Sequence, residues 1–469
     1  MSPEELNLNR RHFLKTSAIA ATGLSFGLKP LEAPSILAQP NGNSKIGVGF
    51  IGIGNRGSDL MHLFMAQPDV KVVALCDVYE PYIYRDRSKV APRFIEIYGG
   101  KVPRMGEQFD QEVGRYTDFR KMLEHKGLDA VVIATPDHWH AIQTIMACDA
   151  GKDVYVEKPL TITIHEGRKM VEAAQRTNRV VAVGLNRRGS TVYQHLAQQV
   201  QNGAIGKVCV GLAGRVSNMY PDGIGKYQSE EPPPGLNWDM WLGPREVRPF
   251  QYNITPYMFR WWKAYSSQMG NWGVHYMDVI RWLINEKAPL AITAHGGKYV
   301  LNDDRTIPDT MEVIFEFASG AIVKFSINEA SSGNVVTEGE IELHGTRGNL
   351  FASERHYKIV PGEPGQFQNW QSTISGDEKK VSDLLGAPDQ RENSTANLVR
   401  NFLDCVKSRK TPLCSLEEGH RSTTFAHLAN IALEMRSRIE WNPEKEMITN
   451  LPEVNKLLHY EYRKPWKLG

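Results

Sequence analysis

The sequence predicts an α/β protein with two domains. We expect an N-terminal Rossmann domain built on a doubly wound parallel sheet, followed by an α+β domain with an open, mostly antiparallel sheet. In the first part, short apolar runs alternate with helical patterns, as in parallel sheets. A Gly-x-Gly-x-x-Gly sequence at residues 52–57 lies between the first such run and the first helical pattern. After about residue 190 the alternation becomes apolar and polar, which indicates half-buried strands.

Length and composition set limits on this prediction. The chain has 469 residues, and roughly 150 residues per domain gives two or three domains. Lys plus Arg (55) nearly balance Asp plus Glu (53), so the net charge of +2 gives no reason to expect a nucleic acid partner. No apolar run approaches the ~18 residues of a membrane span. The five cysteines are widely separated, so we expect neither a disulfide framework nor a metal site.

Residues 1–44 are interpreted as a signal and linker. Arg10 and Arg11 are followed by Phe13, Leu14 and Lys15, and then by an apolar run too short to cross a bilayer. This pattern resembles a twin-arginine signal, so we expect the Tat machinery as a partner and an exported, periplasmic location. A disordered basic tail is the alternative.

Residues 45–186 are predicted to form the Rossmann domain, which begins with a buried strand at 46–51. In the glycine sequence that follows, Gly52 permits a tight turn and Gly54 lets the backbone approach a pyrophosphate. Gly57 lets helix and strand pack closely. Asn55 and Arg56 open the helix, whose free N–H groups face the phosphates.

The second strand, at 70–75, leads to an acidic residue. Asp77 can accept hydrogen bonds from ribose hydroxyls and would repel a 2′-phosphate, which favours NAD. Arg85 and Arg87 lie close in sequence and keep NADP as the alternative cofactor. A turn cap is the structural alternative for Asp77.

Three later strands, at 130–134, 153–156 and 180–185, also end in polar residues. Ligands of such sheets lie at the carboxyl ends of strands, so we expect these residues near the cofactor. A helix cap or a packing role is the alternative for the histidine among them. The residues are Thr135, Pro136, His140, Glu157, Lys158 and Asn186.

These motifs occur in a distinctive order. The glycine turn, Thr-Pro-Asp-x-x-His, Glu-Lys-Pro and Gly-x-Asn-Arg-Arg together resemble the Gfo/Idh/MocA oxidoreductases, which include glucose–fructose oxidoreductase. The resemblance covers nearly everything from residue 45 onward. It implies that Lys158 lies beside the nicotinamide and the reacting hydroxyl of a sugar or polyol. It also implies a substrate and oligomerisation domain at residues 187–469, whose exposed sheet face pairs in homo-oligomers.

Within that second domain, strands are expected at 311–317, 322–327, 340–343 and 348–351, joined by short turns. Residues 360–392 are rich in Gly, Ser and Asp and are predicted to form a surface loop. Helices are expected at 396–407 and 416–438.

The stretch 256–282 is rich in aromatic residues with basic residues between them, a combination that suits the apolar faces and hydroxyls of sugars. An aromatic core or a dimer contact is the alternative. The candidate substrate-binding residues are Arg188, Trp261, Trp262, Lys263, Asn271, His275 and Asp278.

A histidine in this stretch is the second candidate catalytic residue. On a helix, positions 271, 275 and 278 share one face. The family pattern there is Asp-x-x-x-His, and the resemblance implies that His275 takes the hydroxyl proton. Asn271 replaces the aspartate, and an amide can orient His275 but cannot stabilise an imidazolium by charge.

Together these residues predict hydride transfer from a sugar carbon to NAD, with His275 as base and Lys158 polarising the oxygen. An exported enzyme has no obvious pool for recharging NADH, so we infer a tightly held nucleotide that is regenerated in place. Either a second substrate takes the hydride, or the same sugar is oxidised, altered and reduced, as in a lyase, epimerase or glycoside hydrolase. A catalytically inactive sugar-binding protein and a cytoplasmic dehydrogenase are the remaining alternatives.

Overall fold

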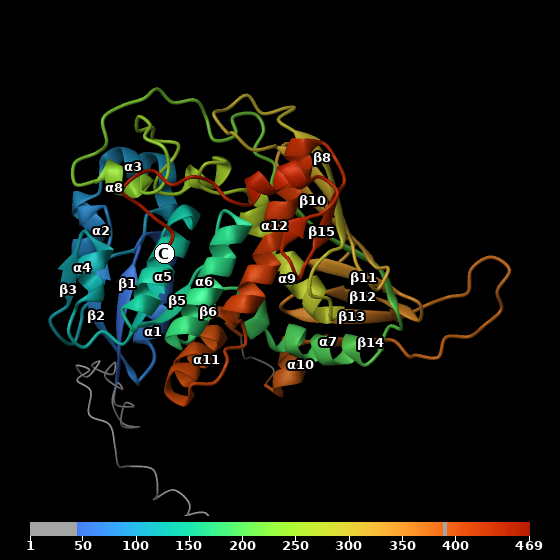
Figure 1. Ribbon diagram of the computed structural model, residues 1–469. Coiled ribbons are helices and arrows are strands. Elements are labelled where there is room, and N and C mark those ends of the chain that lie inside the picture. The colour runs from blue at the N-terminus through green and yellow to red at the C-terminus, as the bar shows by residue number, and fades with distance from the viewer. Residues whose placement is uncertain (1–44, 388–391) are drawn as a thin grey trace, which may run out of the picture. The chain divides into compact units, whose positions relative to one another are not determined.

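Six parallel strands form the first sheet, in the order β3-β2-β1-β4-β5-β6 (Figure 1). The structure is a computed structural model that describes residues 45–387 and 392–469, so the predicted signal lies outside the described residues. The strands are β1 (Ile46–Ile51), β2 (Val70–Cys76), β3 (Gly114–Tyr116), β4 (Ala130–Ile133), β5 (Asp153–Val156) and β6 (Val181–Val183). Strands β1, β4, β5 and β6 are buried along their whole length, as expected of strands covered on both faces.

Helices connect these strands, which confirms the predicted doubly wound fold. They are α1 (Asn55–Met65), α2 (Glu80–Tyr84), α3 (Pro92–Tyr98), α4 (Phe119–Leu123), α5 (His140–Asp149) and α6 (Ile164–Thr177). Thr163 caps α6 in a capping box with Glu166, since each side chain accepts a hydrogen bond from the other residue's backbone N–H.

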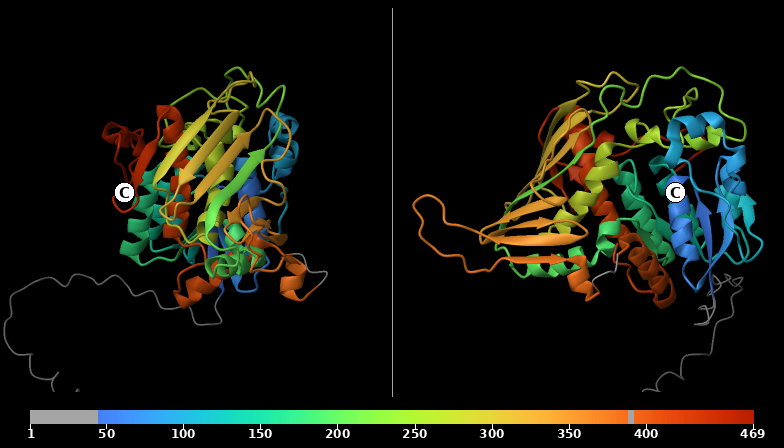
Figure 2. Two further views of the ribbon diagram at one scale, coloured as in Figure 1. Left: turned by 90° about the vertical axis from the view of Figure 1, so that its right-hand side faces the viewer. Right: turned by 180° about the vertical axis from the view of Figure 1, so that it is seen from behind.

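The second sheet has ten strands and is mixed, because β7 and β10 pair in parallel while its other pairs are antiparallel. Its alternating pattern has the predicted consequence: Val313 and Val323 are buried, whereas Ile314 and Ile322 are exposed. The left view of Figure 2 shows the face that no helix covers. The strands are β7 (Val208–Val216), β8 (Ala291–Gly297), β9 (Thr310–Glu316), β10 (Ile322–Asn328), β11 (Ile341–Gly345), β12 (Gly348–Ala352), β13 (His356–Pro361), β14 (Asp377–Lys380), β15 (Ile439–Asn442) and β16 (Met447–Ile448).

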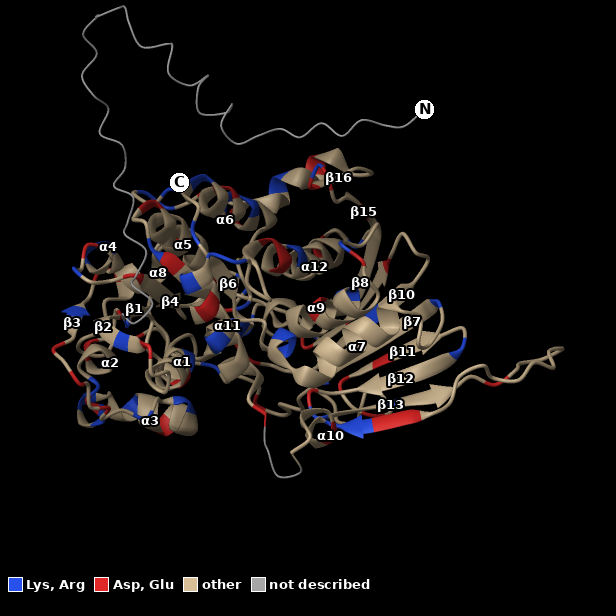
Figure 3. Ribbon diagram, turned by 90° about the horizontal axis from the view of Figure 1, so that it is seen from below, with Lys and Arg blue, Asp and Glu red and all other residues tan. Residues whose placement is uncertain are grey.

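The remaining helices are α7 (Thr191–Gln201), α8 (Trp238–Leu242), α9 (Val274–Leu283), α10 (Val381–Leu385), α11 (Ser394–Ser408) and α12 (Leu416–Met435). One prediction was wrong here: the surface loop expected at 360–392 contains β14 and α10. Strand β14 reads Asp-Glu-Lys-Lys and has no apolar alternation, so its pairing with β13 left no signal in the sequence. Figure 3 shows both signs of charge side by side on this strand.

Helix α12 joins the two sheets. It contacts α6 and β6 of the Rossmann domain as well as α9 and β8 of the second domain. Just before it, Ser415 forms an isolated bridge with Ala182 of β6. The described residues, 45–387 and 392–469, accordingly belong to one compact unit. Within residues 45–387 and 392–469, no helix has the length and apolar character needed to cross a membrane.

Candidate cofactor and substrate site

One cavity of about 350 Å³ brings together most of the predicted site residues, a size typical of small-molecule sites. Its floor is the carboxyl end of the first sheet, and its other walls come from α8, the segment around residue 257 and the start of α9. The predicted residues on its lining are Gly52, Gly54, Asn55, Arg56, Asp77, Thr135, Pro136, Glu157, Lys158, Asn186, Asn271 and His275.

The glycine turn has the geometry of a phosphate cradle. Gly52 has a φ of +81°, in the region that favours glycine. A Cβ at position 57 would lie 2.0 Å from the carbonyl oxygen of Gly52, so any other residue there would push α1 off the sheet. Gly54 precedes the first turn of α1, where backbone N–H groups are free to bind an anion. The turn therefore fits the pyrophosphate of a dinucleotide.

Asp77 is held in place at the end of β2. Its carboxylate accepts hydrogen bonds from the backbone N–H groups of Ile53 (2.8 Å) and Tyr79 (3.0 Å). Burial raises the pKa of Asp77 to about 6, against the effect of these hydrogen bonds. Each oxygen keeps a second lone pair, so the carboxylate can still accept ribose hydroxyls.

Arg85 and Arg87, which left NADP as the alternative cofactor, form hydrogen bonds with other parts of the protein. Arg85 donates to Glu107 and to the carbonyl oxygen of Ile53, at 2.6 and 3.1 Å. Arg87 donates to the carbonyl oxygen of Pro103 at 2.9 Å. Neither lines the cavity, so neither of these two arginines faces the place of a 2′-phosphate, and the site fits NAD.

His140 lies behind the cavity wall and does not line it. Its two ring nitrogens lie 2.9 Å from the carbonyl oxygens of Thr135 and Pro159. Thr135 follows β4, and Pro159 follows β5. His140 thus links the two strand-end segments that carry the cofactor side of the site, and it positions them without facing the ligand.

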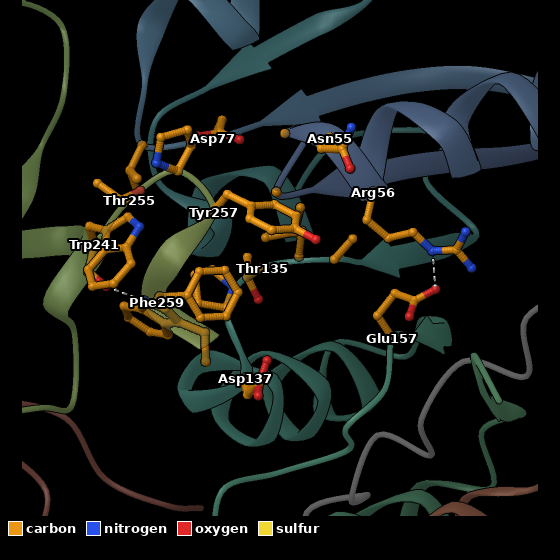
Figure 4. A pocket seen from close by; sticks show the side chains of 18 of the residues that line it. Asn55, Arg56, Asp77, Thr135, Asp137, Glu157, Trp241, Thr255, Tyr257 and Phe259 are labelled. Atoms are coloured by element: carbon orange, nitrogen blue, oxygen red, sulfur yellow. Dashed lines mark hydrogen bonds and ion pairs between the residues drawn. The ribbon is translucent and has the colours of Figure 1, made fainter. Parts of the chain in front are cut away.

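An ion pair lies at one end of the cavity. The Nε of Arg56 lies 2.7 Å from Oε1 of Glu157, whose side chain is 5% exposed. In the view of Figure 4, this pair lies at one end of the cavity, Asp77 and Thr255 lie at the other, and Tyr257 lies between them. The elongated shape suits a dinucleotide that runs from Asp77 toward Lys158.

Lys158 projects toward the second domain. Its Nζ donates to the backbone oxygen of Asn271 (2.9 Å) and to Oδ1 of the same residue (3.2 Å). Burial lowers the pKa of Lys158 to about 8, although Glu157 acts in the opposite direction. The lysine therefore remains an ammonium at neutral pH, and its proton is easier to remove than usual.

The regular helix expected at Asn271 is absent, because Met269–Gly273 forms a π-helical turn before α9. Because a π-helical turn is wider than an α-helical one, positions 271 and 275 are not oriented relative to each other as they would be on an α-helix. The side chain of Asn271 contacts Lys158 and donates to Gln268 at 3.1 Å. In the described part of the chain it makes no hydrogen bond to His275.

His275 lines the cavity but is 8% exposed, and its Nδ1 has no hydrogen-bond partner in the structure. Burial, followed by the charges of Lys158 and Arg187, lowers the pKa of His275 well below its usual range. The imidazole is therefore neutral near pH 7, which is the form that can accept a proton.

The segment between β7 and α9 closes the cavity over the first sheet. The carbonyl oxygen of Trp241 accepts hydrogen bonds from His138 (2.9 Å) and from the indole of Trp139 (3.1 Å), which fixes α8 to the Rossmann domain. The lining residues of this segment include Leu236, Met240, Trp241, Thr255, Pro256, Tyr257, Phe259 and Arg260. A nucleotide in this cavity would be covered along much of its length.

Two residues predicted to bind substrate lie outside the lining. Arg188 and Asp278 are buried and form an ion pair through two 2.9 Å contacts. Glu418 accepts from Arg188 at 2.6 Å, and the hydroxyl of Ser422 donates to Asp278 at 2.6 Å. The pair is part of the packing between η4 (Asn186–Gly189), α9 and α12, and it does not reach the cavity.

The aromatic stretch contains both residues that line the cavity and residues that do not. Trp261 donates to Glu329 at 2.8 Å, and Trp262 is buried and donates to the carbonyl oxygen of Asn253 at 2.8 Å. Lys263 is exposed and pairs with Glu434 at 2.7 Å. None of the three lines the cavity, in contrast to Tyr257, Phe259, Arg260 and Trp272 of the same stretch.

Several lining residues carried no prediction, among them Tyr82, Asp137 and Trp241. Arg260 had a signal that was not used: it is a basic residue between aromatic ones in a stretch expected near the substrate. Its guanidinium donates to the backbone oxygen of Tyr257 at 2.9 Å, and no described carboxylate lies within ion-pair distance of it. Trp241 lies in no motif, so only the tertiary structure identifies it.

A glycine turn before α1, an anchored carboxylate after β2, and a lysine at the tip of β5 converge on one cavity. This arrangement defines a two-domain protein of the nicotinamide-nucleotide-binding oxidoreductase class. Residues 46–185 match the model of the oxidoreductase family's NAD-binding Rossmann fold, and residues 190–468 match that family's C-terminal alpha/beta domain. The chain belongs to the Gfo/Idh/MocA oxidoreductase family, and its first domain is NAD-binding.

Similar proteins include carbohydrate enzymes. A glycosyl hydrolase family 109 protein of Shewanella pealeana is 32% identical over 37% of this chain and 38% of its own length. An alpha-N-acetylgalactosaminidase of Shewanella oneidensis is 27% identical over 45% of this chain and 47% of its own length. The chain thus spans less than half the length of these curated relatives. Levoglucosan dehydrogenase, solved with NADH and levoglucosan, shares the fold with a TM-score of 0.61, 18% identity, and coverage of 85% of this chain and 99% of that one.

Proposed function

We propose that this protein oxidises a sugar, glycoside or polyol by hydride transfer to a tightly held NAD. One observation carries the proposal: Lys158 and His275, from different domains, line the same cavity as the glycine turn and Asp77. A small hydroxylated molecule beside Lys158 would therefore touch both side chains and lie at the nicotinamide end.

The two side chains divide the proton chemistry. NAD, when bound, accepts the hydride that leaves a carbinol carbon. The neutral imidazole of His275 accepts the proton of the hydroxyl on that carbon. The ammonium of Lys158 donates a hydrogen bond to the same oxygen and stabilises its growing negative charge. Asn271 keeps Lys158 aimed at this point through its two oxygen atoms.

The closed cavity supports retention of the nucleotide. Asp77 is partly buried, and Trp241, Tyr257 and Phe259 cover the cofactor side of the sheet. Release would require α8 to break its hydrogen bonds with His138 and Trp139. We therefore propose that NAD stays bound through many turnovers, and that a second substrate takes the hydride from the reduced nicotinamide in place. The test is mass spectrometry of the denatured, unsupplemented protein: fully active enzyme that contains no nucleotide would exclude retention.

A second candidate follows from the curated relatives, which are named as glycosidases. Here the same sugar is oxidised at C3, loses the C2 proton and its aglycone, and is reduced again; for hydrolysis, water adds across C1 and C2 before the reduction. A ketone at C3 acidifies the C2–H bond, so the aglycone can depart by elimination. The overall reaction would be glycoside hydrolysis, elimination or epimerisation without net consumption of NAD.

One experiment separates the two candidates. The purified protein is incubated with a panel of sugars and nitrophenyl glycosides in D2O, and both nicotinamide absorbance and nitrophenol release are followed. Net oxidation gives a lasting rise in reduced nicotinamide. The redox-assisted route gives nitrophenol and deuterium at C2 with no lasting rise. Neither signal with any of the compounds would favour a sugar-binding relative without catalysis.

Export and self-association also belong to the proposal. The basic leader supports export by the twin-arginine route. A double variant, Arg10→Lys with Arg11→Lys, is expected to remain in the cytoplasm, and an unchanged location would favour a cytoplasmic dehydrogenase. The uncovered face of the second sheet supports a homo-oligomer, which light scattering on the purified protein tests.

A further inference from the structure

One tyrosine of the cavity lining has a hydroxyl with no hydrogen-bond partner among the described residues. Tyr82 lies on α2, directly after the segment that carries Asp77, and it is 3% exposed. Its hydroxyl makes no hydrogen bond in the structure, although its side chain lines the cavity. A buried polar group without a partner is costly, and such groups in native proteins call for an explanation.

The surroundings of Tyr82 indicate where a partner would lie. Its ring is the nearest group to a notional Cβ on Gly54, at 3.6 Å, so it lies beside the phosphate cradle. Burial raises the pKa of Tyr82, and the charge of Asp77 raises it further. The group is therefore a neutral hydroxyl that can donate a hydrogen bond.

We propose that the hydroxyl of Tyr82 binds the adenosine ribose–phosphate portion of NAD, by donating a hydrogen bond to one of its oxygens. The nucleotide then completes a site that the protein leaves unsatisfied. This assignment depends only on nucleotide binding and not on the reaction proposed above. Tyr79 holds the phenol in register, since the two rings pack edge to face at a centroid distance of 5.0 Å.

The chain offers a matched control. Tyr155 is also fully buried, and its hydroxyl also lacks a partner. It lies on β5 and packs against Phe64 and Phe402, at 5.8 Å in both cases, away from the cavity lining. Tyr82→Phe and Tyr155→Phe therefore remove the same atom from two buried positions, and only one of these positions lines the cavity.

The test measures affinity and stability in the full chain freed of nucleotide. Tyr82→Phe should weaken NAD and ADP binding about tenfold by calorimetry, whereas Tyr155→Phe leaves both unchanged. Nicotinamide mononucleotide, which lacks the adenosine half, should bind both variants and the wild type equally. Adenosine and ADP then distinguish the ribose from the phosphate as the acceptor.

The Tm of the variants is a second measurement, and a purely structural role of the Tyr82 hydroxyl would give a different result. Because the hydroxyl has no partner without nucleotide, Tyr82→Phe should keep or raise the Tm of the free protein. The same variant should reduce the rise in Tm that saturating NAD produces. Unchanged NAD affinity in Tyr82→Phe would overturn the assignment, as would an equal loss in Tyr155→Phe. Normal nucleotide binding with no turnover on any sugar would instead count against the proposed reaction alone.

Discussion

The ammonium nitrogen of Lys158 lies 2.9 Å from the backbone oxygen of Asn271, and this contact joins the two domains at the reactive end of the cavity. The lysine comes from the tip of β5, and the asparagine comes from the π-helical turn before α9. A turn of this kind directs the carbonyl oxygen and the side-chain oxygen of one residue toward the same cation. The contact therefore aligns the substrate domain with the cofactor domain.

Replacing Lys158 should remove the chemistry and leave the cofactor. Lys158→Met lacks the ammonium that stabilises the developing oxyanion, so turnover should fall about 100-fold to 1,000-fold. Bound NAD, measured in the denatured protein, should remain at the wild-type level. Lys152→Met is the control, because its ammonium donates to the carbonyl oxygen of Leu128 at 2.9 Å and lies off the lining. Equal losses in both variants would contradict the assignment.

Turnover should depend on pH through Lys158. Burial lowers its pKa to about 8, so the ammonium form, and with it the rate, declines as the pH rises through 8. Asn271→Asp places a carboxylate where an amide oxygen now lies 3.2 Å from Nζ, and a nearby negative charge favours the ammonium. The falling limb of the pH–rate profile should therefore move to higher pH. An unchanged limb would show that another group controls it, and Asn271→Ser provides the uncharged comparison.

Affinity for NAD should depend on the ionisation of Asp77. Burial raises the pKa of this carboxyl to about 6, and the ionised form accepts ribose hydroxyls best. We expect the Kd for NAD to rise as the pH falls through 6, and to lose this dependence in Asp77→Asn. The stability of the nucleotide-free protein has the opposite pH dependence, because a low pH favours its folded state. The folded state binds the proton more tightly than the unfolded state, so stability declines as the pH rises from 3.8 to about 6.

Removing the acid should not convert the cofactor preference. Asp77→Ala abolishes repulsion of a 2′-phosphate, but Arg85 remains committed to Glu107 and to Ile53. We expect weaker NAD binding without a matching gain for NADP, as measured by titration with each nucleotide. Tight NADP binding by this single variant would show that Arg85 exchanges its partners freely.

Stability separates two residues that were predicted together as substrate contacts. Asp278→Asn leaves Arg188 buried with an incomplete set of partners, so the free energy of unfolding should fall by about 3 kcal/mol or more. Lys263→Ala removes an exposed ion pair and should change it by less than about 1 kcal/mol. Urea denaturation of both variants measures the difference. A small effect of Asp278→Asn, together with a raised KM, would return Asp278 to the substrate site.

The sequence was most informative where local geometry and function coincide. Gly52 follows β1 directly and turns the chain with a positive φ, and a carboxylate after the second parallel strand lies at the same sheet edge. Both features follow from strand order alone, so the Rossmann fold and the cofactor side were predictable. The polar edge strand β14 was not, because its stability comes from pairing with β13.

The substrate side was harder to predict because side-chain direction there depends on tertiary packing. Trp262 and Tyr257 are both aromatic residues of the same stretch. Trp262 is nevertheless buried and donates to the carbonyl oxygen of Asn253, whereas Tyr257 lines the cavity. Arg188 belongs to a motif of the family, but its partner Asp278 turns it inward. The π-helical turn at Asn271 also alters the facing that a regular helix would give. None of these choices is encoded within a few residues of the side chain concerned.

Helix α12 has one further consequence. It contacts β6 in one sheet and β8 in the other, and its burial leaves little freedom for either sheet to rotate away. Many two-domain enzymes admit ligands by swinging about a hinge, and a shared central helix resists that motion. A ligand would then enter the cavity through movement of the segment between β7 and α9, and this movement would set the rate of ligand exchange. The two domains would unfold together in one cooperative transition.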